Sequence, residues 1–385
     1  GDREDLFQNR REGLFCHPMV THLHVRSSSL PGLRGTSWIS SPILPEVSSE
    51  NLLTGAPGAC TTEGVNAMTP RLRRYEGNPI LTPTSRWWEA RWVFNCGAAV
   101  YQGRVHLLYR AQGLDFISRW GLATSDDGLR IVSRSQHPVF EPAVHLDQER
   151  LGCEDPRITP LGGRFYITYT AASVYPTIGP GRRRPSGAFS REGVPWRIRI
   201  GLASTRNFRT FRRHGFIFPK VDDKDAALFP EKINGRYYLL HRIYPNIHLA
   251  YSEDLRHWRN LGILMKPRQG MWDSERIGAG APPVKTPYGW LLFYHGADHQ
   301  RVYRIGLALL DLRVPQRVLA RTEEPVLEPE EEYERRGQVP NVVFTCGAVE
   351  LDGRYIVYYG AADTVIAAAT IDQEEVLQWA ASVSR

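Results

Sequence analysis

The stretch Gly353-Arg354-Tyr355-Ile356-Val357-Tyr358-Tyr359-Gly360 places a glycine turn directly before a run of aromatic and β-branched residues. Such side chains favour strands, and glycine supplies the backbone freedom that a tight turn needs. The pattern occurs four more times, and successive turn glycines are 54 to 72 residues apart; these copies begin at Gly103, Gly163, Gly235 and Gly289. Repetition at a period of this size predicts a series of similar β-units.

Further strands are predicted on both sides of each copy. The strand before it is expected at 97–101, 156–160, 228–233, 282–285 and 347–351, and the strand after it at 120–125, 200–205, 247–252, 305–310 and 365–370. A polar turn and an edge strand follow three of the copies. Four antiparallel strands per unit are typical of a propeller blade. The sequence therefore predicts an all-β, five-bladed β-propeller, and a β-sandwich with coincidental hairpins is the alternative.

Residues 1–67 differ from the rest of the chain. They contain no lysine, and runs such as 27–29, three serines, show no sustained period. We expect a poorly ordered N-terminal extension here, or an artefact of upstream translation. The catalytic propeller is predicted to span residues 68–385, beginning at Met68.

Charge and composition limit the classes of partner that the chain is expected to bind. The formal net charge is +7, but the dense basic cluster 182–184 lies in a Gly/Pro-rich stretch without interleaved aromatic residues, so no nucleic-acid partner is predicted. No segment approaches the ~20 apolar residues that span a bilayer, and no signal peptide is evident. The five cysteines show no metal-ligand spacing, which predicts reduced thiols, no metal and a cytoplasmic location.

Polar residues near strand ends are the candidates for chemistry, because the inner strands of a propeller converge on a central channel. Glu154-Asp155 directly precedes the strand predicted at 156–160, although an acidic pair in such a place is also a common turn feature. Five further side chains with donor groups lie on successive units: Arg110, Lys232, Arg242, His295 and Tyr303. Each alone could be a surface charge or an ion-pair partner. Together they indicate an anion site, since cationic donors bind phosphate through charge-assisted hydrogen bonds.

Several motifs, in order, resemble glycoside hydrolase family 130, the β-mannoside phosphorylases and related β-1,2-mannosidases. They are Gly152-Cys153-Glu154-Asp155-Pro156-Arg157, the stretch 225–232 with His241-Arg242, and Tyr294-His295-Gly296 followed by 303–306. The resemblance begins near Tyr75 and continues to the C-terminus. It does not cover residues 1–67, and 172–197 looks like an insertion relative to compact members.

The resemblance implies that Asp155 is the catalytic acid. It would pass its proton through the 3-hydroxyl of the mannosyl unit to the bridging oxygen, while phosphate attacks the anomeric carbon with inversion and gives α-mannose 1-phosphate. Inorganic phosphate would be the co-substrate, held by the five donor residues named above, and no cofactor is implied. The hydrolytic branch lacks much of this cationic set, so phosphorolysis is predicted here.

Five more residues match positions that contact the mannosyl ring in the family: Asn95, Arg157, Asp225, Asp273 and Asp363. Trp272 is expected to offer an aromatic platform. The alternative for Asn95 and Asp363 is turn capping.

The substrate predicted from the resemblance is a β-1,4-mannooligosaccharide or β-1,4-mannosyl-N-acetylglucosamine. A phosphorylase of β-1,2-mannobiose or β-1,2-oligomannan is the first alternative, and a β-mannosidase that uses water is the second. A propeller that binds glycans without cleaving them is the third, but a binding module needs neither the Glu154-Asp155 motif nor the cationic set. A homo-oligomer is possible by analogy with relatives.

Overall fold

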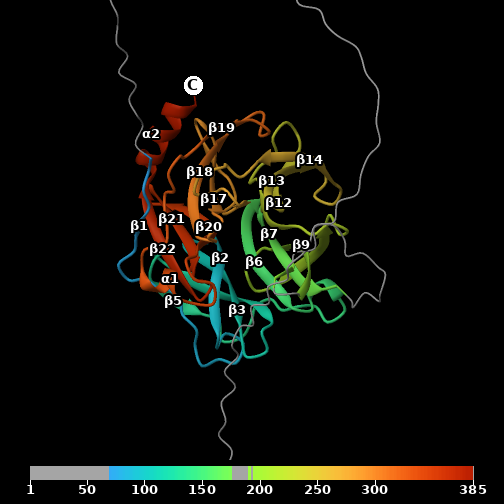
Figure 1. The fold of residues 1–385 in the computed structure, drawn as a ribbon. Coiled ribbons are helices and arrows are strands. Elements are labelled where there is room, and N and C mark those ends of the chain that lie inside the picture. The colour runs from blue at the N-terminus through green and yellow to red at the C-terminus, as the bar shows by residue number, and fades with distance from the viewer. Residues whose placement is uncertain (1–68, 176–189, 192–193, 385) are drawn as a thin grey trace, which may run out of the picture. The chain divides into compact units, whose positions relative to one another are not determined.

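The computed structural model describes residues 69–175, 190–191 and 194–384. The predictions for residues 1–67, and for most of the segment 172–197, lie outside the described residues. The described chain is almost entirely β-structure, with a short 3-10 turn at Asp147–Glu149 and the helices α1 (Glu332–Arg335) and α2 (Gln373–Val383) (Figure 1). The predicted all-β class is confirmed. No helix in these residues is long and apolar enough to cross a membrane.

The strands group into antiparallel units of four. Unit 1 contains β2 (Trp92–Tyr101), β3 (Arg104–Gln112), β4 (Ser118–Ser125) and β5 (Ile131–Arg134). Unit 2 contains β6 (Gly152–Leu161), β7 (Arg164–Val174), β9 (Val194–Thr205) and β10 (Phe211–Ile217), with β8 (Ser190–Arg191) beside β9. A single parallel bridge, Ser118 to Gly152, joins these two units.

The remaining strands complete the pattern. Unit 3 contains β11 (Lys224–Leu228), β12 (Tyr237–Ile243), β13 (Asn246–Ser252) and β14 (Trp258–Met265). Unit 4 contains β15 (Arg276–Ala279), β17 (Gly289–Ala297), β18 (Tyr303–Leu310) and β19 (Val318–Arg321), with β16 (Val284–Thr286) beside β17. Unit 5 contains β20 (Val343–Leu351), β21 (Arg354–Ala361), β22 (Val365–Asp372) and β1 (Arg73–Arg74).

Most predicted strands are confirmed. The strand expected at 282–285 overlaps the short β16, whereas the first strand of unit 4 is β15. The first strand of unit 3 is shifted as well. It was expected at 228–233, whereas β11 spans Lys224–Leu228. Its ladder with β12 is interrupted between Lys224 and Ala227, which disguises the strand pattern in the sequence. The apolar residues that follow lead into a turn, where Pro230 has no N–H to donate to a ladder.

The first strands of the units lie next to one another. β2 contacts both β6 and β20, and β11 contacts both β6 and β15, while β20 also contacts β17 and β18 of unit 4. Figure 1 shows β2, β6 and β20 side by side although their residues are far apart in the chain. Polar side chains at the ends of these strands are therefore brought together.

A buried bond between an acid and a ring, here called the anchor bond, recurs in every unit. The ring belongs to the glycine-started strand, and the acid lies 18 to 25 residues earlier; the pairs are Tyr109–Glu89, Tyr169–Glu149, His241–Asp223, Tyr294–Asp273 and Tyr359–Glu334, at 2.6 to 2.8 Å. An arginine also pairs with the acid in units 1, 2, 4 and 5: Arg134, Arg213, Arg321 and Arg74. Each buried acid thus has a donor, as burial of a charge requires.

The anchor rings also explain the glycines of the third strands. A Cβ at Gly121 would overlap the ring of Tyr109, and one at Gly201 would overlap that of Tyr169. The glycine of the Gly-Leu-Ala sequence in these strands is therefore required by the anchor ring.

Unit 5 is completed from both ends of the described chain. β1 pairs with β22, so that Arg73 lies opposite Thr370 and Arg74 opposite Ala369. Arg74 Nε donates to Glu334 at 2.9 Å, and Glu334 is also the anchor acid of this unit. The N-terminal strand therefore closes the last unit through a buried ion pair.

We predict that this closure depends on Glu334. Replacing it with alanine leaves Arg74 and the Tyr359 hydroxyl without their buried acceptor, so the free energy of unfolding should fall by about 2–4 kcal/mol, measured by urea denaturation. Glu330 pairs with the same arginine at 2.7 Å, but its side chain is 58% exposed. Glu330→Ala is therefore the matched control and should cost less than about 1 kcal/mol. Equal losses in the two variants would contradict a buried closure.

Candidate active site

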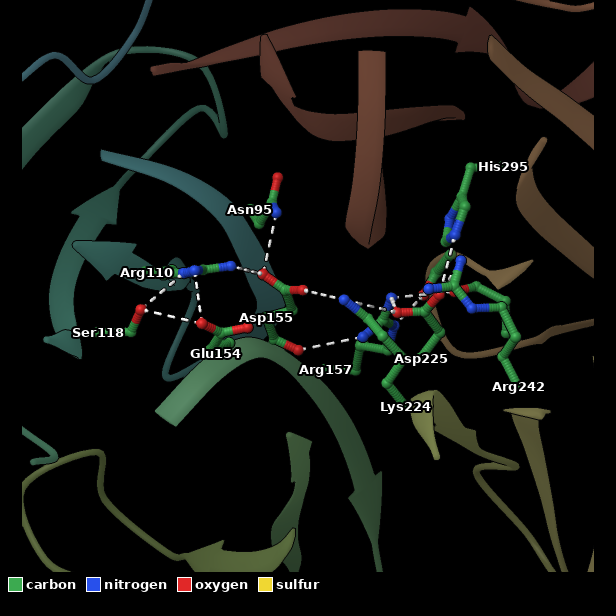
Figure 2. Close-up of polar contacts among 12 residues, drawn as sticks. Asn95, Arg110, Ser118, Glu154, Asp155, Arg157, Lys224, Asp225, Arg242 and His295 are labelled. Carbon is green, nitrogen blue, oxygen red and sulfur yellow. Dashed lines mark hydrogen bonds and ion pairs between the residues drawn. The ribbon is translucent and has the colours of Figure 1, made fainter. Parts of the chain in front are cut away.

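Three first strands carry the same irregularity at the same place. The ladders of β2, β6 and β11 each shift register, and the residue in the shift has a positive φ: Asn95 (47°), Asp155 (50°) and Asp225 (52°). Asn and Asp tolerate the left-handed conformation better than most residues, and a β-bulge redirects a side chain. All three side chains enter one buried polar cluster (Figure 2).

Asp155 lies at the centre of this cluster and is 1% exposed. Its Oδ1 accepts hydrogen bonds from Asn95 Nδ2 at 2.9 Å and Arg110 Nη1 at 3.1 Å, and Lys224 Nζ lies 3.6 Å from Oδ2. Burial alone would raise the pKa of Asp155, but the charges of Arg110, Lys224 and Arg157 outweigh burial and lower this pKa to about 2. The carboxyl is therefore ionised in the unliganded site.

Glu154 shares the same arginine. Arg110 Nη2 donates to Glu154 Oε1 at 2.6 Å, and Ser118 Oγ lies 3.3 Å from that oxygen and accepts from Arg110 Nε at 3.0 Å. Burial raises the pKa of Glu154, and the neighbouring Asp155 charge adds to the effect. Glu154 was part of the sequence motif without a predicted role. Ser118 had no signal of its own in the sequence, because a lone serine is a common strand residue.

Asp225 forms the second anionic centre. Its Oδ2 lies 2.8 Å from Arg242 Nη1 and 3.1 Å from His295 Nε2, and Lys224 Nζ is 3.9 Å from Oδ1. Burial would raise its pKa, but Arg242, Lys224 and His295 together hold the pKa well below the usual value. Lys224 thus lies between the two carboxylates, Asp155 and Asp225.

His295 is neutral near pH 7, contrary to its prediction as a cation. The residue is fully buried, which lowers its pKa to about 4 despite the Asp225 partner. Nε2 then carries the proton that Asp225 accepts, and Nδ1 has no hydrogen bond within the described residues. Gly278 makes room for this contact, because a Cβ there would overlap His295 Nε2 and Asp225 Oδ2.

Two predicted residues are not brought to the cluster. Lys232 is exposed in the turn after β11, with its ammonium 4.5 Å from the Tyr237 ring. The ladder between β11 and β12 places Lys224 opposite Arg242 at the other end of the hairpin. Lys232 was named from the motif at 225–232, which lies in part on the strand expected at 228–233, and Lys224, one residue before Asp225, was missed.

Asp273 is the second correction. It is the anchor acid of unit 4: Tyr294 donates to it at 2.8 Å and Arg268 at 3.1 Å, and Arg321 pairs with it as well. Trp272 stacks on Tyr294, with 5.4 Å between ring centroids, and its indole N–H donates to the carbonyl of Glu323. These side chains serve the packing of unit 4, and neither has a contact with the cluster among the described residues.

The other predicted residues lie in or beside the cluster. Arg157 is fully buried and donates to the carbonyls of residues 155, 279 and 280, so it ties β6 to unit 4. Tyr303 is half-buried at the start of β18, with its ring centroid 6.3 Å from that of His295. Asp363 lies in the turn between β21 and β22, and its charge acts on Arg110.

The arrangement places a carboxylate among four cationic side chains. Three acids, Glu154, Asp155 and Asp225, contact four cationic side chains, Arg110, Arg157, Lys224 and Arg242. A site of this kind attracts an additional anion, and the carboxylate next to it can exchange a proton with a bound substrate.

The model of glycoside hydrolase family 130, described as beta-1,4-mannooligosaccharide phosphorylase, matches residues 65–196 and 189–382. The chain therefore belongs to this family, whose phosphorylases are enzymes of mannoside metabolism.

Individual relatives agree in length with the described domain. The chain is 41% identical to a 1,2-beta-oligomannan phosphorylase and 42% identical to a Beta-1,2-mannobiose phosphorylase, both from Thermoanaerobacter sp. (strain X514), over 80% of this chain and 99% of each relative. A Beta-1,4-mannooligosaccharide phosphorylase from Ruminococcus albus is 30% identical over 81% of this chain and 91% of the relative. The solved complex of the Listeria innocua beta-1,2-mannobiose phosphorylase with beta-1,2-mannobiose has a TM-score of 0.68 and 31% identity, covering 80% of this chain and 98% of that one.

Proposed function

We propose that the five four-stranded units are the blades of one β-propeller comprising residues 68–385. The anchor bond recurs once per unit, and β1 completes the unit that contains the last strands. The first strands contact one another in the order β20, β2, β6, β11 and β15, and β17 and β18 of unit 4 contact β20. In this arrangement the bulged first strands line the centre, where the polar cluster lies.

We propose further that the enzyme cleaves β-1,2-linked mannosides by inverting phosphorolysis, releasing α-mannose 1-phosphate. The observation that carries phosphorolysis is the cationic set around Asp155. The linkage rests on identity: the two relatives above 40% act on β-1,2-mannosides by name, whereas the β-1,4 relative is 30% identical. The β-1,2 alternative therefore replaces the β-1,4 substrate expected from the sequence.

In the proposed reaction phosphate lies among Arg110, Lys224 and Arg242, within reach of His295 and Tyr303. A phosphate oxygen forms a bond to the anomeric carbon as the bond from that carbon to the bridging oxygen breaks. The electron pair stays on the bridging oxygen, which takes the proton supplied by Asp155 through the sugar 3-hydroxyl. Asn95 and Asp363 would orient the mannosyl unit, and Asp225 and Arg157 would position the cations. Phosphate is the co-substrate, and no cofactor is needed.

The low pKa of Asp155 has a place in this scheme. An acid that is ionised above about pH 2 has no proton to give, so the unliganded site is inactive as a donor. A phosphate dianion near Arg110 and Lys224 would offset the two charges that depress the pKa. Phosphate would then prepare the acid as well as supply the nucleophile.

Hydrolysis is the second reading, and the position of Glu154 argues against it. Inverting hydrolases hold acid and base carboxyls about 6.5–9.5 Å apart, on opposite faces of the sugar. Glu154 and Asp155 both contact Arg110, so they lie on one side.

The deciding prediction concerns the product. With β-1,2-mannobiose and phosphate, the enzyme should release α-mannose 1-phosphate, detected by 31P NMR, and without phosphate it should release almost no mannose. Asp155→Asn should lower turnover by at least about a thousandfold, as expected for loss of the proton donor and of its charge. Free mannose released at equal rates in both samples would establish the hydrolase instead.

Lys224 and Lys232 form a matched pair for the phosphate site. Lys224→Met removes a cation 3.6 Å from Asp155, so the KM for phosphate should rise by about ten- to a hundredfold, the effect of losing a partly buried charge-assisted contact. Lys232→Met removes the same charge from an exposed turn and should leave this KM within about twofold. A large rise in this KM for Lys232→Met, with little change for Lys224→Met, would show that Lys232 binds phosphate, as the sequence predicted.

The pH prediction follows from the link between phosphate and Asp155. If phosphate raises the pKa of Asp155 from about 2, the complex takes up a proton at any pH between the free and bound values, and phosphate affinity rises as pH falls through the bound value. Phosphate that binds as the dianion at pH 6 loses a proton to solvent. Where the bound value lies above 6, calorimetry in buffers of different ionisation enthalpy should therefore show less net proton release than dianion binding alone requires. Asp155→Asn should abolish this difference, and uptake that persists in the variant would assign the proton to another group.

A further inference from the structure

A partly exposed group of aromatic and arginine side chains lies beside the polar cluster. The group, here called the rim surface, comes from the segment that runs into β2 and from the segment that runs from the β3–β4 loop into β4; its members are Trp87, Arg91, Trp92, Leu114, Phe116 and Arg119, of which Trp92 is half-buried and Arg119 is buried. Trp87, Leu114 and Phe116 are 55%, 70% and 52% exposed. These are large apolar side chains to leave in water, and none of them belongs to the reaction proposed above.

The rim surface interleaves rings with cations. The guanidinium carbon of Arg91 lies 4.6 Å from the Trp92 ring centroid and 4.4 Å from that of Phe116, and Arg119 lies 4.7 Å from the Trp87 ring. Arg119 also pairs with Asp115 and Glu141, but Arg91 has no carboxylate partner in the described part of the chain. Its guanidinium lies against two rings that are in contact with each other, and its donors are open to a ligand.

The exposed indole of Trp87 and the half-buried indole of Trp92 also have no hydrogen-bond acceptor in the described residues. Trp88, the neighbour of Trp87, is buried and donates its indole N–H to the carbonyl of Gln136 at 3.1 Å. Among the described residues, neither Trp87 nor Trp92 has such an acceptor. Buried indoles usually find a partner within the protein, so an exposed ring with a free N–H is suited to a polar ligand with an apolar face.

The backbone of the rim is held in one conformation. Phe116 has a φ of 60°, an uncommon value for a bulky residue, and such conformations persist only where the surroundings determine them. Gln112 provides this restraint, since its Nε2 donates to the Phe116 carbonyl at 3.2 Å and to Ser118 Oγ at 2.8 Å. A Cβ at Gly113 would overlap the carbonyl of Trp87, so the two segments are in direct backbone contact.

The same hydrogen bonds connect the rim surface to the catalytic acid. Ser118 accepts from Arg110, and Arg110 donates to Glu154 and Asp155, as the dashed lines of Figure 2 show. Trp92 is three residues before Asn95 on β2 and pairs with Gln112, two residues after Arg110 on β3. The rim surface is thus a direct continuation of the site.

We propose that the rim surface binds the distal sugar units of an oligomannoside whose terminal unit is cleaved at Asp155. This inference rests on the proposed function, which supplies the substrate class. A mannosyl ring has apolar C–H faces that stack on indole and phenyl rings, and hydroxyls that accept from guanidinium and indole N–H groups. A stable subunit interface commonly buries about 1,200–2,000 Å² in total, more area than six side chains provide.

The test compares chain lengths. Trp87→Ala, Arg91→Ala and Phe116→Asn remove ring or cation, and asparagine suits the positive φ at 116. For β-1,2-mannohexaose each variant should lose about five- to tenfold in kcat/KM, the range for one stacked aromatic contact, whereas β-1,2-mannobiose should change less than about twofold. Tyr288→Ala is the control, because Tyr288 is 40% exposed in the turn before β17, at the end remote from His295.

Three outcomes would overturn the inference: equal loss on both substrates, no loss on either, or a change of oligomeric state in the variants by sedimentation, which would make the rim a subunit interface. If the wild type does not phosphorolyse mannobiose, the proposed function is wrong. The proposal for the rim surface is then tested by oligosaccharide binding alone. Calorimetry on Asp155→Asn should then show that mannohexaose binds more tightly than mannobiose, and that Trp87→Ala in the same background removes the difference. Equal affinities would refute the rim.

Discussion

The structure of the site depends on the pairing of Arg110 with two adjacent carboxylates. Glu154 and Asp155 are consecutive, and two buried acids of like charge would each raise the pKa of the other. Arg110 contacts both, at 2.6 and 3.1 Å, while Lys224 reaches only Asp155 of these two acids. The pKa values of the two acids therefore shift in opposite directions: that of Glu154 is raised and that of Asp155 is lowered. Any anion that competes for Arg110 or Lys224 should therefore raise the pKa of Asp155.

This charge arrangement requires a rigid frame, and the anchor bonds provide it. Each joins a buried acid outside the first strand to the ring of the second, so the two strands cannot slide past one another. The bulges at Asn95, Asp155 and Asp225 can then carry a positive φ, a strain that neighbouring structure must hold in place. Gly278 and Gly360 complete the fit, because a Cβ at either would overlap a cluster side chain.

Much of the fold could be predicted from the sequence, because turn glycines and aromatic strands are local features with a visible period. The bulges could not, since one extra residue reverses which side chains face inward and no composition marks it. The bulge in β11 also explains why the predicted strand, 228–233, lies after the observed one, and why the sequence pointed to Lys232 and not to Lys224. Asp155, Arg110, Arg242 and His295 were placed correctly in the cluster because they lie in strands without such a displacement or in a recognisable motif.

The prediction for Asp273 was wrong for a different reason, which shows how the site and the frame are related. Its equivalents are Glu89, Glu149, Asp223 and Glu334, a set that emerges only when the acids are aligned by the ring that each one binds. Successive side chains of a strand point to opposite faces, so a ring that anchors one face forces the next residue towards the other.

The residues that follow the anchor rings are Arg110, Thr170, Arg242, His295 and Gly360. Three of them contact the carboxylates of the cluster, at Asp155 or Asp225. A fourth, Gly360, leaves space for Asn95. The anchor bond, repeated for stability, thus fixes where each unit presents one side chain to the centre. The chemistry of the site can vary at these positions without disturbing the frame, because the anchor ring and its acid lie on the opposite face of the strand.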